Sequence, residues 1–145
     1  MQSTTTPRNP EELHLESLHE ILSLDPRIRF LYLVGSDGSK LYHSGRVGVT
    51  SFDDEEQSDL INVQVALGTA MGKSSEANNG KIRVISVARE RLTMMVFPLY
   101  QAVAIVSAEA DFPLGDAEKV YSALDRLLPD SFKDRSDTHQ TPGMP

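Results

Sequence analysis

Hydrophobic residues along this chain follow two different spacings, one typical of strands and one typical of helices. Short runs rich in β-branched and aromatic side chains indicate strands. Three other segments place apolar residues three or four positions apart, which is the spacing of one helical face. The predicted strands are residues 28–34, 40–43, 81–88, 92–99 and 102–108, and the predicted helices are residues 9–25, 54–76 and 116–128.

The ends of the predicted helices have their own signals. Asn9 is a preferred capping residue, and Pro10 suits the first helical position. Pro26 ends the first helix, because the residue before a proline is pushed away from helical angles. Pro129 ends the last helix in the same way, and Asn79-Gly80 stops the middle one.

The distribution of apolar side chains also predicts where each strand lies in the sheet. Residues 28–34, 92–99 and 102–108 are apolar on both alternating faces, so we expect them inside a sheet that is covered on two sides. Residues 81–88 include Lys81 and Arg83, which suits an edge strand. The turns between the last three strands are short and allow only antiparallel pairing. The predicted fold is an α+β sandwich of order α-β-β-α-β-β-β-α, with helices on both faces of a five-stranded antiparallel sheet.

Polar segments flank this single folded unit. Residues 1–8 have no apolar periodicity, so we expect a flexible arm there. Residues 131–145 contain prolines and few apolar side chains, which is typical of a disordered tail. The predicted domain is therefore residues 9–130 of the 145-residue chain.

The overall charge and composition exclude several classes of partner. The chain has 14 basic and 21 acidic residues and a net charge of −7, so it would repel nucleic acid at long range. No apolar run approaches the roughly 18 to 20 residues of a membrane span, so we expect no membrane insertion. The chain has no cysteine and no apolar signal segment at its N-terminus, so we expect a soluble cytoplasmic protein.

The stretch GTAMGKSS, residues 68–75, resembles a phosphate-binding loop, but its spacing and its position in the chain do not suit phosphate binding. Such a loop needs four residues between its glycines and must lie between a strand and a helix N-terminus. Here three residues separate Gly68 from Gly72, and the segment lies near a helix C-terminus, where the dipole repels phosphate. The two glycines instead leave a shallow groove, either for close contact between helix and sheet or for a helix of a second subunit.

Other polar residues do not converge on a reaction centre. His14 and His19 are five positions apart, which is not the spacing of two metal ligands on one helical face. Glu109 and Asp111 follow a predicted interior strand and are expected to form structural pairs with Arg89 or Arg91. We therefore expect no enzyme activity, no catalytic residue, no metal and no cofactor. Three further groups lack the context of a site: Ser44, Ser107 and the carboxylates of residues 53–56.

The order of elements resembles that of the roadblock (dynein light-chain) superfamily, which is related to longin and profilin-like folds. FLYLVGSDGSKLY, residues 30–42, is similar to the first hairpin of that superfamily. LTMMVFPLYQAVAIVSAEAD, residues 92–111, is similar to its last two strands. The segments GVTSF, ERLTMMVFPL and AEAD also resemble an uncharacterised archaeal domain family of this type.

The resemblance implies a non-catalytic regulatory or scaffold module. Roadblock proteins form homodimers in which edge strands join and middle helices pack together, and they bind protein partners such as small GTPases or signalling complexes. Carried over by position, the joining edge would be residues 81–88 and the packing helix residues 54–76. The implied dimer interface is Ile82, Arg83, Val84, Ile85 and Ser86 of the strand with Val63, Leu67, Gly68 and Gly72 of the helix.

A second hypothesis is a small-molecule sensor, because related sandwiches hold ligands between sheet and helix. Its pocket would be lined by two tyrosines and two methionines, which are also ordinary core residues. These residues are Tyr32, Tyr42, Met94 and Met95.

Overall fold

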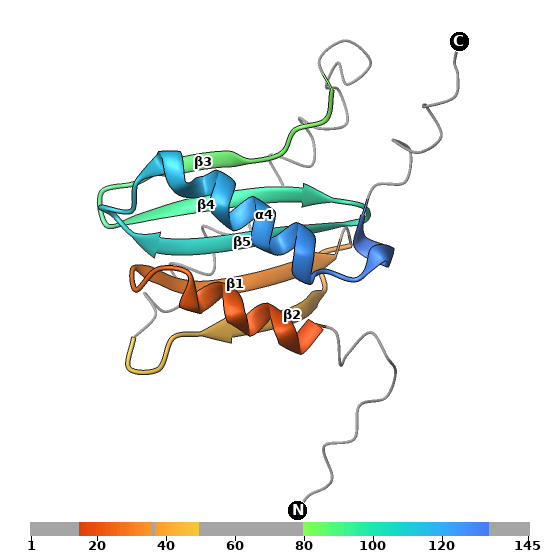
Figure 1. Ribbon diagram of the computed structural model, residues 1–145, viewed down its shortest axis with the longest axis horizontal. Coiled ribbons are helices and arrows are strands. Elements are labelled where there is room, and N and C mark those ends of the chain that lie inside the picture. The colour runs from red at the N-terminus through yellow and green to blue at the C-terminus, as the bar shows by residue number, and fades with distance from the viewer. Residues whose placement is uncertain (1–14, 36, 50–79, 134–145) are drawn as a thin grey trace, which may run out of the picture.

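A five-stranded open antiparallel sheet forms the centre of the molecule (Figure 1). The computed structural model describes residues 15–35, 37–49 and 80–133. The strand order is β2-β1-β5-β4-β3, which confirms the predicted α+β fold class. The strands are β1 (Ile28–Gly35), β2 (Lys40–Gly45), β3 (Ile85–Ala88), β4 (Leu92–Leu99) and β5 (Ala102–Glu109).

The three strands predicted to be interior occupy the middle of the sheet. β5 pairs with β1 on one side, from Ile28 opposite Ala108 to Gly35 opposite Ala102. On its other side β5 pairs with β4 through a two-residue turn at Tyr100 and Gln101. The side chains of these three strands are buried on both faces almost throughout, as continuous apolar runs require.

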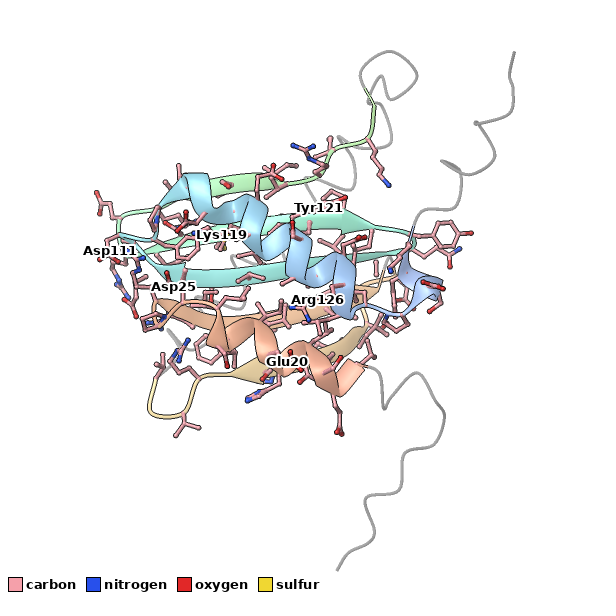
Figure 2. All side chains as sticks on the ribbon, viewed as in Figure 1. Glu20, Asp25, Asp111, Lys119, Tyr121 and Arg126 are labelled. Carbon is pink, nitrogen blue, oxygen red and sulfur yellow. The ribbon has the colours of Figure 1, made fainter. Side chains whose placement is uncertain are left out.

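Two helices cover one face of the sheet, which we call the helix face. They are η1 (Ser17–Ser23) and α4 (Ala117–Leu127). In Figure 1, η1 lies over β1 and β2, and α4 crosses β4 and β5. β5 contributes Ala102, Ala104 and Ala108 to the core on this face. Figure 2 shows the polar side chains on the outer side of the helices, among them Glu20, Lys119 and Arg126.

The first helix is tighter than predicted. Of its described residues, 15 and 16 are α-helical and 17–23 form a 3-10 helix. Leu15, Leu18 and Ile21 are buried, and their spacing of three places them on one side of a helix with three residues per turn. The guanidinium of Arg46 donates to the carbonyl oxygens of Leu22 and Asp25, so it satisfies the end of this helix.

The opposite face of the sheet is equally apolar, and we call it the second face. Phe30, Tyr32, Met94, Val96 and Ile105 are all buried there, with exposed fractions between 0 and 7%. The predicted helix over residues 54–76 lies outside the described residues, as do the arm, the glycine-rich stretch at 68–75 and four predicted interface residues. These four are Val63, Leu67, Gly68 and Gly72.

The predicted edge strand over residues 81–88 is only half as long in the structure. β3 lies at an edge as predicted, but it begins at Ile85. Its register pairs Ile85 with Val96, so a longer ladder would place Arg83 opposite Pro98. A proline has no N–H to donate to a neighbouring strand. The ladder between β3 and β4 therefore stops before it reaches that position.

Packing also extends beyond the predicted domain end at residue 130. A short 3-10 helix, η3 (Asp130–Phe132), follows α4. Phe132 packs against the helix-face core, and its carbonyl oxygen accepts a hydrogen bond of 3.0 Å from the N–H of Tyr100. The start of the predicted tail is thus tied to the turn between β4 and β5.

A methyl group added at Gly45 should destabilise the sheet. Gly45 faces Phe30 across the β1–β2 pair, and a Cβ atom there would lie 2.6 Å from the Phe30 ring. We expect Gly45→Ala to lower the free energy of unfolding by about 1–3 kcal/mol, as for overpacked cores. Urea unfolding would measure this loss. Gly115→Ala is the control, because nothing lies within 4 Å of a Cβ there; equal losses in both variants would contradict the prediction.

Candidate functional site

The two edges of the sheet are where backbone groups can pair with another chain. At one edge, β2 has two features that blunt an edge strand. Its register with β1 shifts between Leu33 and Val34, whose partners are Tyr42 and Lys40. Leu41 is therefore an extra, bulged residue, and Lys40 places a charge beside it. Such an edge is a poor template for a further strand.

Among the described residues, the other edge strand, β3, has neither of these features. Within Ile85–Ala88 there is no proline and no charged side chain, and its register with β4 is continuous. Ile85 and Val87 pack against the second-face core, whereas Ser86 and Ala88 are exposed. Within the part of the chain that the structure describes, β3 is thus an uncharged edge strand without a bulge, the kind that accepts another strand.

The segment just before β3 lies against the first turn of α4. The Arg83 guanidinium is 2.9 Å from a Glu118 carboxylate oxygen and 6.0 Å from the centre of the Tyr121 ring. Val84 packs against the helix-face core. The five predicted interface residues of the strand segment are consecutive in the chain and lie in or just before β3. Two of them are in β3 (Ile85 and Ser86), and three precede it (Ile82, Arg83 and Val84).

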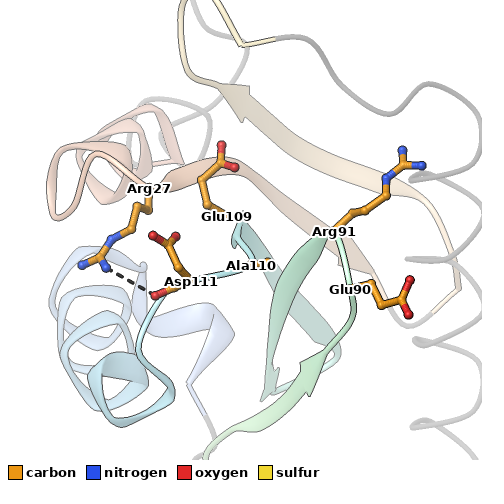
Figure 3. A pocket seen from close by; sticks show the side chains of 6 residues that line it. All are labelled: Arg27, Glu90, Arg91, Glu109, Ala110 and Asp111. Atoms are coloured by element: carbon orange, nitrogen blue, oxygen red, sulfur yellow. Dashed lines mark hydrogen bonds between the residues drawn. The ribbon is translucent and has the colours of Figure 1, made fainter.

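A charged hollow of about 550 Å³ opens at the end of the sheet where β5 ends and β4 begins (Figure 3). Basic and acidic side chains alternate around it, so it has no field of a single sign. In Figure 3, Glu90 and Arg91 on the turn after β3 lie across from Arg27 and Asp111. The lining residues are Arg27, Glu90, Arg91, Glu109, Ala110 and Asp111.

Arg27 is held in this hollow by its neighbours. Its Nε and Nη2 each donate to the Asp25 carboxylate at 2.9 Å, and its Nη1 donates to the Asp111 carbonyl oxygen at 3.4 Å. The Asp25 carboxylate also accepts the backbone N–H of Arg27 at 2.8 Å. Hydrogen bonds from the Arg27 side chain, and then from its backbone, lower the pKa of Asp25 to about 2.

The partner of Glu109 differs from the prediction. Its Oε2 lies 3.2 Å from Nη1 of Arg29, whereas Arg89 or Arg91 was expected. Arg29 belongs to β1, where its side chain is only 7% exposed, and β1 and β5 are adjacent in the sheet. Sequence reasoning missed this pair because the two residues are 80 positions apart. A buried arginine without a carboxylate would be costly, so the pair is structural.

Another long-range contact joins the first helix to the sheet. His19 Nδ1 and Ser44 Oγ lie 2.8 Å apart. Ser44 is 8% exposed, so its hydroxyl is enclosed and holds η1 to β2. Within the described ranges there is no group of three or more residues that could bind a metal ion, and no helix long and apolar enough to cross a bilayer.

The four residues proposed for a sensor pocket are divided between two faces. Tyr32 and Met94 belong to the second-face core, whereas Met95 and Tyr42 belong to the helix-face cluster. The sheet separates the two pairs, so they cannot line one cavity. The structure therefore supports their interpretation as core residues.

Comparison with protein families gives one match that covers most of the chain. Residues 12–129 match a family described as "Family of unknown function (DUF6659)". The chain belongs to this family. No curated protein sequence matches the chain.

Solved structures similar to this DUF6659 protein include several MglB proteins. MglB of Myxococcus xanthus has a TM-score of 0.59 at 14% identity, with 83% of this chain and 92% of that chain covered. Gliding protein MglB of Thermus thermophilus has a TM-score of 0.56 at 17% identity, covering 84% and 93%. An MglB "with tetrameric arrangement" has a TM-score of 0.57 at 17% identity, covering 84% and 92%. At these identities the likeness shows the fold alone.

The stabilising effect of Asp25 should depend on pH. Its pKa is about 2 in the folded protein, against an ordinary value of 3.8. A carboxyl group whose pKa is lowered by folding stabilises the folded state when the pH is above its ordinary pKa. This stabilisation is lost as the pH falls toward the pKa of the folded protein. We expect Asp25→Asn to be less stable than the wild type at pH 7, and the difference to shrink below about pH 4.

Urea unfolding of the wild type and the variant at pH 7, 5 and 3 would measure this difference. Arg27→Gln is the matched control, because it removes the side chain that donates to the Asp25 carboxylate. Its free energy of unfolding should lose the same pH dependence as that of Asp25→Asn. A stability difference that stays constant from pH 7 to pH 3 would contradict the assignment.

Proposed function

We propose that this protein is a non-catalytic homodimeric module that binds and regulates, or scaffolds, a protein partner. The observation on which this rests is the uncharged, regular edge strand β3 among the described residues, in a sheet whose other edge has a bulge and a lysine. An open, uncharged edge strand left bare is an aggregation hazard. Pairing with the same strand of a second copy removes that hazard and satisfies the outer backbone groups.

A stable dimer needs more surface than four residues of strand. Specific interfaces bury roughly 800 Å² on each partner, so flanking residues must contribute. The proposed interface therefore includes Ile82, Arg83 and Val84 before β3. It also includes the four residues of the middle helix that the roadblock resemblance implies, which are Val63, Leu67, Gly68 and Gly72.

The fold likeness supports association with other protein chains. One similar structure is an MglB with a tetrameric arrangement, which is consistent with self-association on this fold. The roadblock resemblance implies small GTPases among the partners. We therefore propose a small GTPase, or a signalling complex that contains one, as the partner class for this protein.

The ion pairs at the charged hollow fit a structural role better than a catalytic one. Nε and Nη2 of Arg27 both donate to the Asp25 carboxylate, and Glu109 is paired with the buried Arg29. These charges are neutralised by fixed neighbours, whereas a general acid or base must be able to reach a substrate proton. The pair of Arg29 and Glu109 thus links the ends of β1 and β5.

Val84→Pro should convert the proposed dimer to a monomer without unfolding it. Val84 lies outside the ladder with β4, which starts at Ile85, so a proline there spares the hydrogen bonds within the sheet. It removes an N–H from the proposed edge and disfavours pairing. Light scattering at micromolar concentration should give twice the 16.0 kDa chain mass for the wild type and the single mass for the variant.

Leu41→Pro is the control at the other edge, because a bulged edge position tolerates proline. It should remain dimeric. A monomeric wild type would contradict the proposed dimer. A Val84→Pro variant that is still dimeric would show that this segment is not part of the interface.

A GTPase partner should bind in a way that depends on its nucleotide. Small GTPases from the cell that produces this protein can be loaded with GDP or with a non-hydrolysable GTP analogue and tested by biolayer interferometry. We expect at least tenfold tighter binding to one nucleotide state, because switch segments differ between the two states. Equal binding to both states, or none, would exclude this partner class while leaving the dimer intact.

A further inference from the structure

We infer that Asn79-Gly80 is a site of spontaneous deamidation, a covalent modification in which the Asn79 side chain loses its amide group as ammonia. This inference does not depend on the proposed dimer or on its partner. Gly80 begins the last described range, and Asn79 is known by its sequence alone. The reaction needs a backbone N–H that can attack the preceding side chain, and Gly80 supplies one.

The reaction has two steps and needs no reagent except water. In the first step, the Gly80 backbone nitrogen bonds to Cγ of Asn79, its proton goes to the departing amide, and ammonia leaves. The product is a five-membered succinimide ring. In the second step, water opens the ring at either carbonyl group, which gives aspartate or isoaspartate at position 79. Either product makes the net charge one unit more negative than −7.

Gly80 meets the structural requirements of the first step. Within the part of the chain that the structure describes, its N–H donates no hydrogen bond, so none must break before the nitrogen attacks. Gly80 is exposed, and nothing lies within 4 Å of the position that a Cβ would occupy. Its φ is +84°, in a region that glycine enters without the penalty of other residues. The attacking nitrogen is therefore accessible.

The other three asparagines lack such a neighbour. Asn9 precedes a proline, which has no N–H. Asn62 precedes a valine, whose two branches at Cβ crowd the backbone nitrogen. Asn78 precedes another asparagine, so a side chain also shields the nitrogen there. The sequence therefore indicates Asn79 as the site of fastest deamidation.

The hairpin turn at Asp37-Gly38 is a contrast within the same chain. An aspartate before a glycine can close the same ring, with loss of water from its protonated carboxyl group. Here the Gly38 N–H donates to the Gly35 carbonyl oxygen at 2.9 Å. Oδ1 of Asp37 accepts the Ser39 hydroxyl at 2.7 Å and the Ser39 N–H at 3.0 Å, and these hydrogen bonds lower the pKa of Asp37. The carboxylate stays ionised and the nitrogen is held, so we expect this turn to be protected.

Deamidation would change the charge and, in part, the length of the chain before β3. Aspartate adds a carboxylate, and a charge-changing modification acts through ordinary electrostatics. In isoaspartate the backbone also runs through the side-chain carbon, which adds one methylene before the segment that leads into β3. Neither product returns to asparagine by reaction with water. The modified fraction would therefore record the age of the protein and would not act as a reversible switch.

Incubation of the folded protein at pH 8 and 37 °C, followed by trypsin and mass spectrometry, tests the site. Trypsin cuts after Lys73 and Lys81, so Asn79 falls in the peptide of residues 74–81. We expect this peptide to gain the mass difference between a hydroxyl and an amino group, in two products that separate by chromatography. A zero-time sample corrects for conversion during digestion. The rate in the folded protein should be within about fivefold of that in the synthetic peptide, because no structure must open first.

Gly80→Ala is the matched variant, because its methyl group shields the nitrogen and leaves the asparagine in place. We expect it to deamidate about tenfold more slowly than the wild type. Asn79→Gln keeps Gly80 and would have to close a larger, six-membered ring, so it should also lose the rapid reaction. Circular dichroism and thermal melting check that both variants are folded.

The turn at Asp37-Gly38 is the internal control in the same digests. The peptide of residues 30–40 should form isoaspartate about tenfold more slowly in the folded protein than as a free peptide. Ser39→Ala should remove most of this protection, because it deletes the hydroxyl that donates to Asp37.

The outcomes decide whether the fold leaves the site accessible. A rate at Asn79 more than about fivefold below that of the free peptide would show that the fold protects it, and would overturn the inference. Faster deamidation at Asn62 or Asn78 than at Asn79 would overturn it as well. Light scattering tests the proposed dimer separately, so a failure here leaves the proposed function unchanged.

Discussion

The pairing of β1 with β5 is the interaction on which the rest of this structure depends. It joins Ile28 to Ala108, and so brings the first hairpin of the chain against the last one. Because β5 also pairs with β4, the sheet acquires three interior strands and leaves β2 and β3 at its margins. The same pairing places Arg29 beside Glu109 and closes the charged hollow at the strand ends.

A few residues account for the difference between the two edge strands, β2 and β3. At β2, the extra residue Leu41 interrupts the register, which twists an edge away from further pairing. At β3, Pro98 of the neighbouring strand limits the ladder to four residues and leaves residues 80–84 beside the sheet without joining it. One proline therefore accounts for the short β3.

Much of this fold was predictable from the sequence, and the failures have physical causes. The interior strands and α4 were predicted within two residues of their observed bounds, because continuous apolar runs and proline stops are local signals. The shortened β3 depends on its register with Pro98, which is visible only once strands are paired. The contacts between His19 and Ser44 and between Arg29 and Glu109 join distant positions, and no local pattern indicates them. The spacing of three from Leu15 to Ile21 was a signal for a 3-10 helix.

The geometry of the sheet also constrains how a dimer through β3 could meet a third protein. A two-fold axis perpendicular to the sheet reverses the strand direction, so the hollows of the two copies would lie at opposite ends of the joined sheet. Glu90 and Arg91, which line the hollow, directly follow β3. A single compact partner could not fill both hollows from one end. A partner that binds once per dimer must therefore contact the region near the axis, whereas a partner that binds the hollow would bind twice.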